Sequence, residues 1–252
     1  MRESIPSPES TGSMPKRHNL GSTLMREVSV GPVETSLFQR AEWMVESSQI
    51  QKYLADRIVY SDKLAGKVSE GLAIACIGAG KGHEMDEIDS LLPGSKIIGI
   101  DPHDHHTRPV KNRLDTLAND ATYLSKNVTA ENLEGVEDSS LDAVTLFFVL
   151  HHIEEDRQKK VFDEINRVLK DEGMLFIAED LVDNEAERKT TKTKDRLLNM
   201  EIKKTSPHNY KSKEEWTELF AKHGFVMVEI QEQTPKKVRH VFFVLKKRKL
   251  VV

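Results

Sequence analysis

Short apolar runs alternate with amphipathic stretches from about residue 72 to the end of the chain. Near-continuous apolar runs are typical of strands buried on both faces, and the stretches between them carry apolar residues at helical spacing. Strands interleaved with helices predict an α/β fold with a mostly parallel sheet covered on both faces. The predicted strands are 72–77, 96–101, 122–128, 141–149, 173–179, 225–231 and 238–246, and the predicted helices are 81–92, 107–120, 154–169 and 212–223.

The C-terminal pattern predicts a capped helix followed by an antiparallel pair of strands. Glu215 follows Ser212 at capping-box spacing, and Gly224 comes directly after the helical pattern, so the helix is expected to begin and end at these residues. Only a short segment, 232–237, separates the last two predicted strands. Because a parallel crossover needs a longer connection, these two strands must be antiparallel.

The rest of the chain divides by composition. Residues 1–30 are rich in Ser, Pro, Gly and charged residues, which bury too little apolar surface to offset the cost of ordering, so they predict a disordered tail. Residues 31–68 carry apolar side chains at helical spacing and predict an N-terminal helical cap. Residues 69–252 form the predicted main domain, within which the polar stretch 183–213 predicts a lid or insertion.

Bulk properties narrow the class of protein. The net charge of -4 does not favour binding to nucleic acid or to an anionic membrane surface. The single cysteine, Cys76, excludes an internal disulfide and a multi-cysteine metal site. No apolar stretch reaches the roughly 20 residues that span a membrane, and the N-terminus lacks the apolar core of a secretory signal. We expect a cytoplasmic protein; the alternative is a mitochondrial address, which Glu3 and Glu9 disfavour.

The first predicted strand leads into three glycines at alternate positions, Gly78, Gly80 and Gly82. Strand, glycine turn and helix together indicate a nucleotide site, where a backbone without side chains approaches the ligand closely. A dinucleotide fingerprint needs a glycine at the position of His83, and a phosphate loop needs Ser or Thr after Lys81. The turn therefore fits neither pattern, and a tight strand-to-helix turn without a ligand is the alternative.

A carboxylate stands at the end of the second predicted strand. In a doubly wound sheet, Asp101 lies beside the first turn and can accept both hydroxyls of a ribose; a surface aspartate before a turn is the alternative. The ligand-type residues His103, Asp104, His105 and His106 follow at once. Adjacent loop residues seldom converge on one ion, so no metal is predicted there or elsewhere.

Five segments, taken in order, resemble a known family. They are IACIGAGKG, IIGID, LDAVTLFFVLHHI, LKDEGMLFIAED and YKSKEEWTELFAKHGFVMVEI. They resemble the successive motifs of class I S-adenosylmethionine-dependent methyltransferases of the small-molecule type, similar to the ubiquinone and menaquinone methyltransferases, over about residues 70–247. The resemblance implies a Rossmann-like α/β fold whose seven-stranded, mostly parallel sheet has an antiparallel last strand and helices on both faces. It also implies S-adenosylmethionine as cofactor and in-line methyl transfer to a small-molecule acceptor.

The resemblance further implies cofactor contacts along one edge of the sheet. Gly78, Ala79 and Gly80 would pass under the methionine moiety, Asp101 would bind the ribose, Pro102 would flank the adenine, Thr129, Ala130 and Glu131 would surround its amino group, and Leu146 and Phe147 would line the methyl-donor side.

Two positions depart from the family pattern. Cys76 and Thr129 stand where the family usually has acidic residues. Cys76 is small enough to pack, and Thr129 can still form a hydrogen bond without carrying charge. These departures motivate a second hypothesis, a catalytically weak or inactive methyltransferase-like binding module. An NAD(P)-dependent oxidoreductase is the third hypothesis, which His83 and the antiparallel final strands disfavour.

Candidate chemistry on the acceptor side follows the fourth strand. His151 and His152 stand there, and His151 is the candidate general base that would deprotonate a substrate hydroxyl, although the resemblance implies that at least one of the two is structural. The sequence FVLHHI lacks the Asn/Asp-Pro-Pro-Tyr motif of nucleic-acid amino methylation, so we expect a small-molecule acceptor. The basic residues of 183–213 form either a solvated face or an attraction for an anionic substrate, and His208 and Tyr210 could reach the active site.

Overall fold

The computed structural model describes residues 71–103, 117, 120–124, 128–198, 206–233 and 238–249. The predicted N-terminal tail and helical cap therefore lie outside the described residues, as does nearly all of the predicted helix 107–120.

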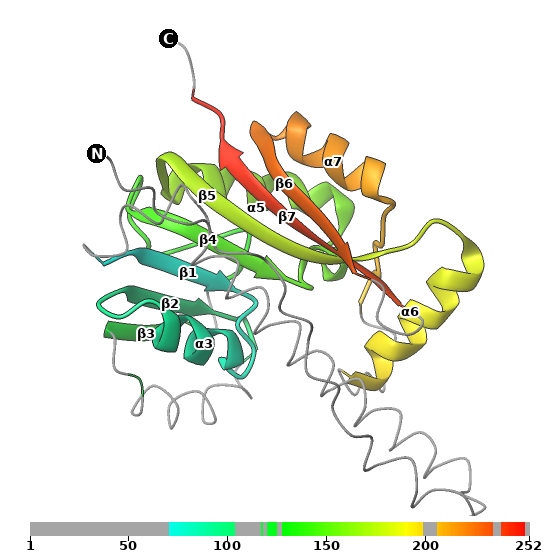
Figure 1. The fold of residues 1–252 in the computed structure, drawn as a ribbon, viewed down its shortest axis with the longest axis horizontal. Coiled ribbons are helices and arrows are strands. Elements are labelled where there is room, and N and C mark those ends of the chain that lie inside the picture. Colours follow the sequence, from blue (N-terminus) through cyan, green and yellow to red (C-terminus); the bar gives the residue numbers. More distant parts are fainter. Residues whose placement is uncertain are drawn as a thin grey trace, which may run out of the picture. The chain divides into compact units, whose positions relative to one another are not determined.

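The described residues form one seven-stranded sheet in the order β3-β2-β1-β4-β5-β7-β6 (Figure 1). All neighbouring pairs are parallel except those of β7, which is antiparallel to both β5 and β6. The predicted fold class and the antiparallel last strand are confirmed. The strands are β1 Ala73–Ile77, β2 Lys96–Ile100, β3 Asp120–Leu124, β4 Leu141–Phe147, β5 Leu169–Leu181, β6 Phe225–Gln233 and β7 Arg239–Lys247.

Helices cover both faces of this sheet. Helices α5 and α7 lie on one face and α3 on the other (Figure 1), and two buried apolar clusters, one on each side, form the core. Among the described helices, none is long and apolar enough to cross a bilayer. The helices are α3 His83–Leu91, α5 Glu155–Val168, α6 Glu185–Leu198 and α7 Lys213–Lys222, with a short 3₁₀ helix, η3, at Leu150–His152.

Helix α7 begins with the predicted capping box. The Ser212 hydroxyl accepts a hydrogen bond from the Glu215 backbone N–H, and the Glu215 carboxylate accepts one from the Ser212 N–H at 2.7 Å. Gly224, at a φ of 86°, follows the helix and takes the left-handed conformation that favours glycine. Trp216 and Phe220 are buried on the face that packs into the core.

Three elements differ from the predictions. Strand β5 begins at Leu169 rather than at residue 173, because Leu169 pairs with Leu141 before a register shift in β4. Strand β3 covers 120–124, where 122–128 was predicted. The polar stretch 183–213 contains helix α6, which the sparse apolar pattern concealed. The signal was a cap: Asn184 Oδ1 accepts a hydrogen bond from the backbone N–H of Glu187, three residues on.

A carboxyl group is buried where α3 meets the sheet. Glu84 lies in the first turn of α3, is only 4% exposed, and contacts Cys76 and Thr145, which are paired neighbours on β1 and β4. Burial raises the pKa of Glu84 to about 7, although Thr145 and Cys76 act in the opposite direction. Its Oε1 atom makes no hydrogen bond within the described residues. Above pH 7 the fold therefore contains a buried, incompletely solvated carboxylate.

We expect Glu84→Gln to remove a pH-dependent loss of stability. This carboxyl ionises near its ordinary pKa of 4.5 in the unfolded chain and near 7 in the folded one, so the wild-type free energy of unfolding falls as pH rises through this window. A shift of this size corresponds to roughly 3 kcal/mol. Denaturant unfolding should show little pH-dependent difference near pH 4.5 and a growing advantage of the variant up to pH 7. Glu87→Gln, on the same helix, is the control; an advantage that does not change with pH would contradict the assignment.

Candidate active site

The glycine turn is hydrogen-bonded to the end of the neighbouring strand. The N–H groups of Gly78 and Ala79 both donate to the Ile100 carbonyl, at 2.7 and 3.1 Å. The next residue, Gly80, donates its N–H to Asp101 Oδ2 at 3.0 Å, and its carbonyl accepts the Tyr123 hydroxyl at 2.8 Å. Burial raises the pKa of Tyr123, so this hydroxyl keeps its proton and remains a donor. The turn is thus held from β2 and β3 before any ligand binds.

Two glycines of the turn have different reasons to be glycine. A side chain at Gly78 would place its Cβ 2.2 Å from Val149 Cγ2, and the residue has a φ of 75°. At Gly80 the φ is 51° and the nearest atom to a Cβ would be 3.9 Å away. Gly78 therefore allows the close approach of the segment after β4, whereas at Gly80 no described residue comes closer to a Cβ than the Gly78 carbonyl oxygen.

Asp101 lies beside the glycine turn at the end of β2. It is only 6% exposed; Oδ2 accepts from Gly80 and Oδ1 accepts from the His103 N–H at 2.8 Å. Pro102 is exposed next to it. The predicted roles of Asp101 toward a ribose and of Pro102 toward an adenine stay predictions. The histidines at 105 and 106 lie outside the described residues.

The predicted adenine segment forms a small closed turn between β3 and β4. Thr129 and Asn132 exchange backbone hydrogen bonds at 3.1 and 3.0 Å, and Ala130 is buried between them. The Glu131 carboxylate pairs with Arg157 of α5 at 2.6 Å. The turn is therefore anchored to α5, and its contact with a cofactor stays a prediction.

The end of β4 presents residues that the sequence analysis missed. Leu146 is fully buried and Phe147 is 6% exposed, on opposite faces of the sheet, so their predicted role beside the methyl donor stays a prediction. Phe148 has a φ of 60°, a strained value for a large side chain that is typical of functional sites. Val149 fills the space against Gly78. Their position directly after the strongest apolar strand was the available signal.

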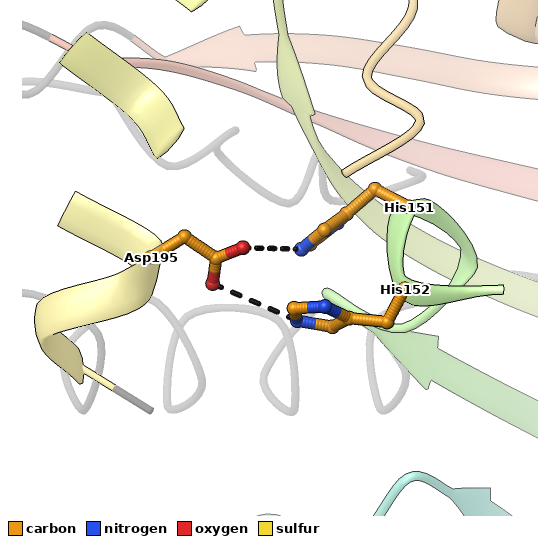
Figure 2. A group of neighbouring side chains, drawn as sticks. All are labelled: His151, His152 and Asp195. Atoms are coloured by element: carbon orange, nitrogen blue, oxygen red, sulfur yellow. Dashed lines mark ion pairs between the residues drawn. The ribbon is translucent and has the colours of Figure 1, made fainter. Parts of the chain in front are cut away.

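Polar side chains gather at the same edge of the sheet, in a group called here the His–Asp cluster. Asp195 of α6 stands at its centre: Oδ2 lies 3.3 Å from His151 Nε2, and Oδ1 lies 3.6 Å from His152 Nε2 (Figure 2). The Tyr210 hydroxyl donates to Asp195 Oδ2 at 2.8 Å, and His208 Nδ1 lies 3.0 Å from the same oxygen. The structure thus brings together the His151, His152, His208 and Tyr210 of the sequence analysis; Asp195, missed as a site residue, joins them.

Both histidines of η3 have a second partner behind them. His151 Nδ1 lies 2.6 Å from Glu179 Oε2, and the other oxygen of Glu179 accepts the Leu150 N–H at 2.7 Å. His152 Nδ1 lies 2.5 Å from the Ser206 hydroxyl. These contacts fix the two rings so that both Nε2 atoms face Asp195.

The charges of the cluster are strongly coupled. Burial lowers the pKa of His151, but Glu179 and Asp195 outweigh burial and place this pKa well above its usual value. Burial and the neighbouring His151 lower the pKa of His152 to about 3. His151 therefore holds a proton at neutral pH and His152 is neutral. A protonated imidazole cannot accept a proton, so His151 would act as the predicted base only after losing this one.

Helix α6 is fastened to the sheet edge by a second set of contacts. Lys194, adjacent to Asp195, lies with Nζ 3.1 Å from His240 Nε2, and His240 Nδ1 pairs with Asp180 at 2.5 Å. His240 stands at the start of β7 and Asp180 near the end of β5, in register with each other. Lys194 thus attaches α6 to β7, and the neighbouring Asp195 attaches it to η3.

Residues 75–177 match a protein family described as "Methyltransferase domain". This part of the chain runs from β1 into β5 and contains the glycine turn, Asp101 and both histidines of η3. These residues therefore form a methyltransferase domain that depends on S-adenosylmethionine. This match rules against the oxidoreductase hypothesis. The antiparallel β7 agrees with a methyltransferase domain.

Solved structures similar to this chain share its fold at low sequence identity. They include an arsenic(III) S-adenosylmethionine methyltransferase from Chlamydomonas reinhardtii (19% identity, TM-score 0.53, covering 72% of this chain and 64% of that one). A phosphoethanolamine N-methyltransferase 2 from Haemonchus contortus, in complex with S-adenosyl-L-methionine, matches at 18% identity and a TM-score of 0.56, covering 71% and 49%. A putative sarcosine dimethylglycine methyltransferase from Galdieria sulphuraria matches at 14% identity and a TM-score of 0.58, covering 79% and 86%. This chain thus spans less than two thirds of the first two proteins, and no curated protein matches its sequence significantly.

The residues of the glycine turn fit the methyl donor of this family. Among the described residues, the nearest atom to a Cβ at Gly80 would be the Gly78 carbonyl oxygen at 3.9 Å, and the buried carboxylate of Asp101 stands at the side of this glycine. A cofactor with a ribose and an aminoacyl end needs such an uncovered backbone next to a carboxylate.

We expect Asp101→Ala to weaken the binding of S-adenosylhomocysteine, the product form of the cofactor, by at least tenfold. The substitution removes the acceptor of the Gly80 N–H, and a hydrogen bond to a charged group contributes about 1.5–3 kcal/mol. Tyr123→Phe removes only the hydrogen bond from the uncharged Tyr123 hydroxyl to the Gly80 carbonyl and should weaken binding a few-fold. Isothermal titration calorimetry gives both affinities, and equal affinities for wild type and Asp101→Ala would refute the role of this carboxylate.

Proposed function

We propose that the enzyme transfers a methyl group to a small-molecule acceptor that binds beside the His–Asp cluster. The observation that carries the proposal is the short path from the glycine turn to this cluster. Val149 packs against Gly78, and His151 follows two residues later at the same edge of the sheet. An acceptor beside the cluster therefore lies near the place where the turn would hold the cofactor.

The accessible side of the cluster supports a small acceptor. The side chain of His152 is 28% exposed, whereas His151 and Tyr210 are almost fully buried. Helix α6 closes over the cluster through Lys194 and Asp195, so a ligand meets His152 first. A bulky nucleic acid would have to displace this helix, and the net charge of -4 does not favour one.

The chain's own residues would orient the acceptor and exclude water. The cofactor supplies an electrophilic methyl group on a sulfonium, and in-line displacement needs the acceptor atom held opposite the departing sulfur. Correct orientation alone lowers such barriers by about 7–11 kcal/mol. Imidazole, phenol and carboxylate groups offer hydrogen bonds to an acceptor with a hydroxyl or amino group. His151 as general base is part of this proposal for acceptors whose proton must be removed.

The acceptors named for similar proteins suggest which compounds to test as methyl acceptors, but they do not identify the acceptor of this enzyme. Soft ions prefer several thiolate ligands, and the single cysteine of this chain is buried, so arsenic(III) is a poor candidate. Phosphoethanolamine and sarcosine carry amines, and the ubiquinone and menaquinone group of the sequence resemblance suggests hydroxylated aromatic rings, with the acceptor atom left open. Hydroxylated aromatic rings and small amines therefore come first.

The proposal predicts acceptor-dependent release of S-adenosylhomocysteine. The purified enzyme is incubated with S-adenosylmethionine and each compound of the panel, and the product is quantified by mass spectrometry. At least one hydroxyl or amine acceptor should raise the release above the acceptor-free rate, and Asp101→Ala should abolish the increase. Asp163→Asn, an exposed substitution on α5, is the control. Tight cofactor binding without turnover of any acceptor would favour the binding-module hypothesis that Cys76 and Thr129 motivate.

A further inference from the structure

We propose that His151, His152 and Asp195 bind a divalent transition-metal ion. Each residue offers one ligand atom, and the three atoms lie within 4.8 Å of one another. Two come from η3 and one from α6, so the site joins segments far apart in the sequence (Figure 2). This assignment goes beyond methyl transfer, because metal binding can be measured without any acceptor.

The spacing of the ligand atoms fits an ion between them. Around a tetrahedral ion with bonds of about 2.0–2.1 Å, neighbouring ligand atoms lie about 3.4 Å apart. Asp195 Oδ2 lies 3.3 Å from His151 Nε2, the other oxygen, Oδ1, lies 3.6 Å from His152 Nε2, and the three ligand atoms together lie within 4.8 Å of one another. Small movements of these side chains would therefore complete the geometry.

A buried nitrogen atom faces this space without a hydrogen bond. His151 is 1% exposed, and its Nε2 lies 3.3 Å from Asp195 Oδ2, which is close enough for an ion pair but lacks the geometry of a hydrogen bond. Buried polar atoms are nearly always hydrogen-bonded, so such an atom calls for an explanation, and a bound ion is a common one. The atom points at Asp195 (Figure 2).

Each ligand also has the outer partner that metal ligands usually have. Metal-binding histidines commonly donate their other ring N–H to a carboxylate or another oxygen, which fixes the ring and its tautomer. Glu179 holds His151 Nδ1 at 2.6 Å, and Ser206 holds His152 Nδ1 at 2.5 Å. The Tyr210 hydroxyl holds the Asp195 carboxylate at 2.8 Å. If these side chains only fastened α6 through ion pairs, the outer contacts from Glu179, Ser206 and Tyr210 would not all be required.

The donor set indicates which ions fit. Two imidazoles and one carboxylate suit Zn²⁺, Co²⁺ or Fe²⁺ rather than Mg²⁺ or Ca²⁺, which prefer oxygen ligands. Three protein ligands leave a position open, as in catalytic zinc sites, and the partly exposed His152 marks the side from which a ligand arrives. The next step rests on the proposed function: the open position would take a hydroxyl oxygen of the methyl acceptor. With its Nε2 on the ion and its Nδ1 on Glu179, His151 would then be a ligand and not the general base.

The test is a titration of the chelator-treated full-length protein with Zn²⁺, followed by calorimetry, with Co²⁺ absorption as a second readout. Wild type should bind one Zn²⁺ per chain at this site. His152→Gln should weaken binding by about 100-fold or more, and Ser206→Ala, which removes only an outer partner, by about tenfold. His152 is partly exposed, so its substitution should leave the fold intact, which circular dichroism checks.

Two controls separate this site from other histidines. The His105→Ala/His106→Ala double variant tests the histidine-rich segment 103–106, and His223→Gln tests a histidine that stacks on Phe162 away from the cluster. Both should bind Zn²⁺ as wild type does. No binding at micromolar Zn²⁺, unchanged binding in His152→Gln, or loss only in the double variant would each overturn the proposal. S-adenosylhomocysteine titrated into the same samples reports on the methyltransferase site separately, so either assignment can fail alone.

Discussion

The carbonyl of Ile100 sets the geometry on which the site depends. This single acceptor takes the N–H groups of both Gly78 and Ala79, so the turn after β1 is tied to the end of β2. Asp101 then follows in the chain at the place where it can accept from Gly80. The register of β1 and β2 therefore determines the geometry of the site. The pairing of Ile77 with Ile100 fixes where the Asp101 carboxylate lies relative to the Gly80 backbone.

A second constraint acts at the far side of the same edge, where carboxylates are buried. Glu179 is fully buried in β5 and Asp195 is nearly buried on α6, and two such anions need a cation between them. His151 lies between the two carboxylates, and in its protonated form it supplies the positive charge that balances them. A metal ion held by its Nε2 would supply that charge instead. With either cation, the attraction between that cation and Asp195 keeps α6 against the sheet. The contact that fastens this helix is therefore also the contact that places Asp195 in the site.

Local patterns predicted the framework because they act over a few residues. Apolar runs placed β1, β2, β4, β6 and β7 to within two or three residues, and the Ser212–Glu215 box placed α7. Helix α6 was missed because its sequence, EAERKTTKTKDRLL, has few apolar positions, although the Asn184 cap was visible. Asp195 could not be assigned to the site at all. Its partners stand 44 and 43 residues earlier, at positions that only the path of β5 and α6 brings together.

The direction of β7 separates the two edges of the sheet. Since β7 runs against β5, its first residues lie beside Asp180 and Leu181, while its last residue, Lys247, pairs with Phe225 at the start of β6. The chain therefore leaves this strand on the side away from the glycine turn. The end of the sheet with the glycine turn and the His–Asp cluster is held by hydrogen bonds and ion pairs, and β7 finishes at the other end. A reporter or tether joined after β7 would therefore start at the end of the sheet away from the glycine turn and the His–Asp cluster.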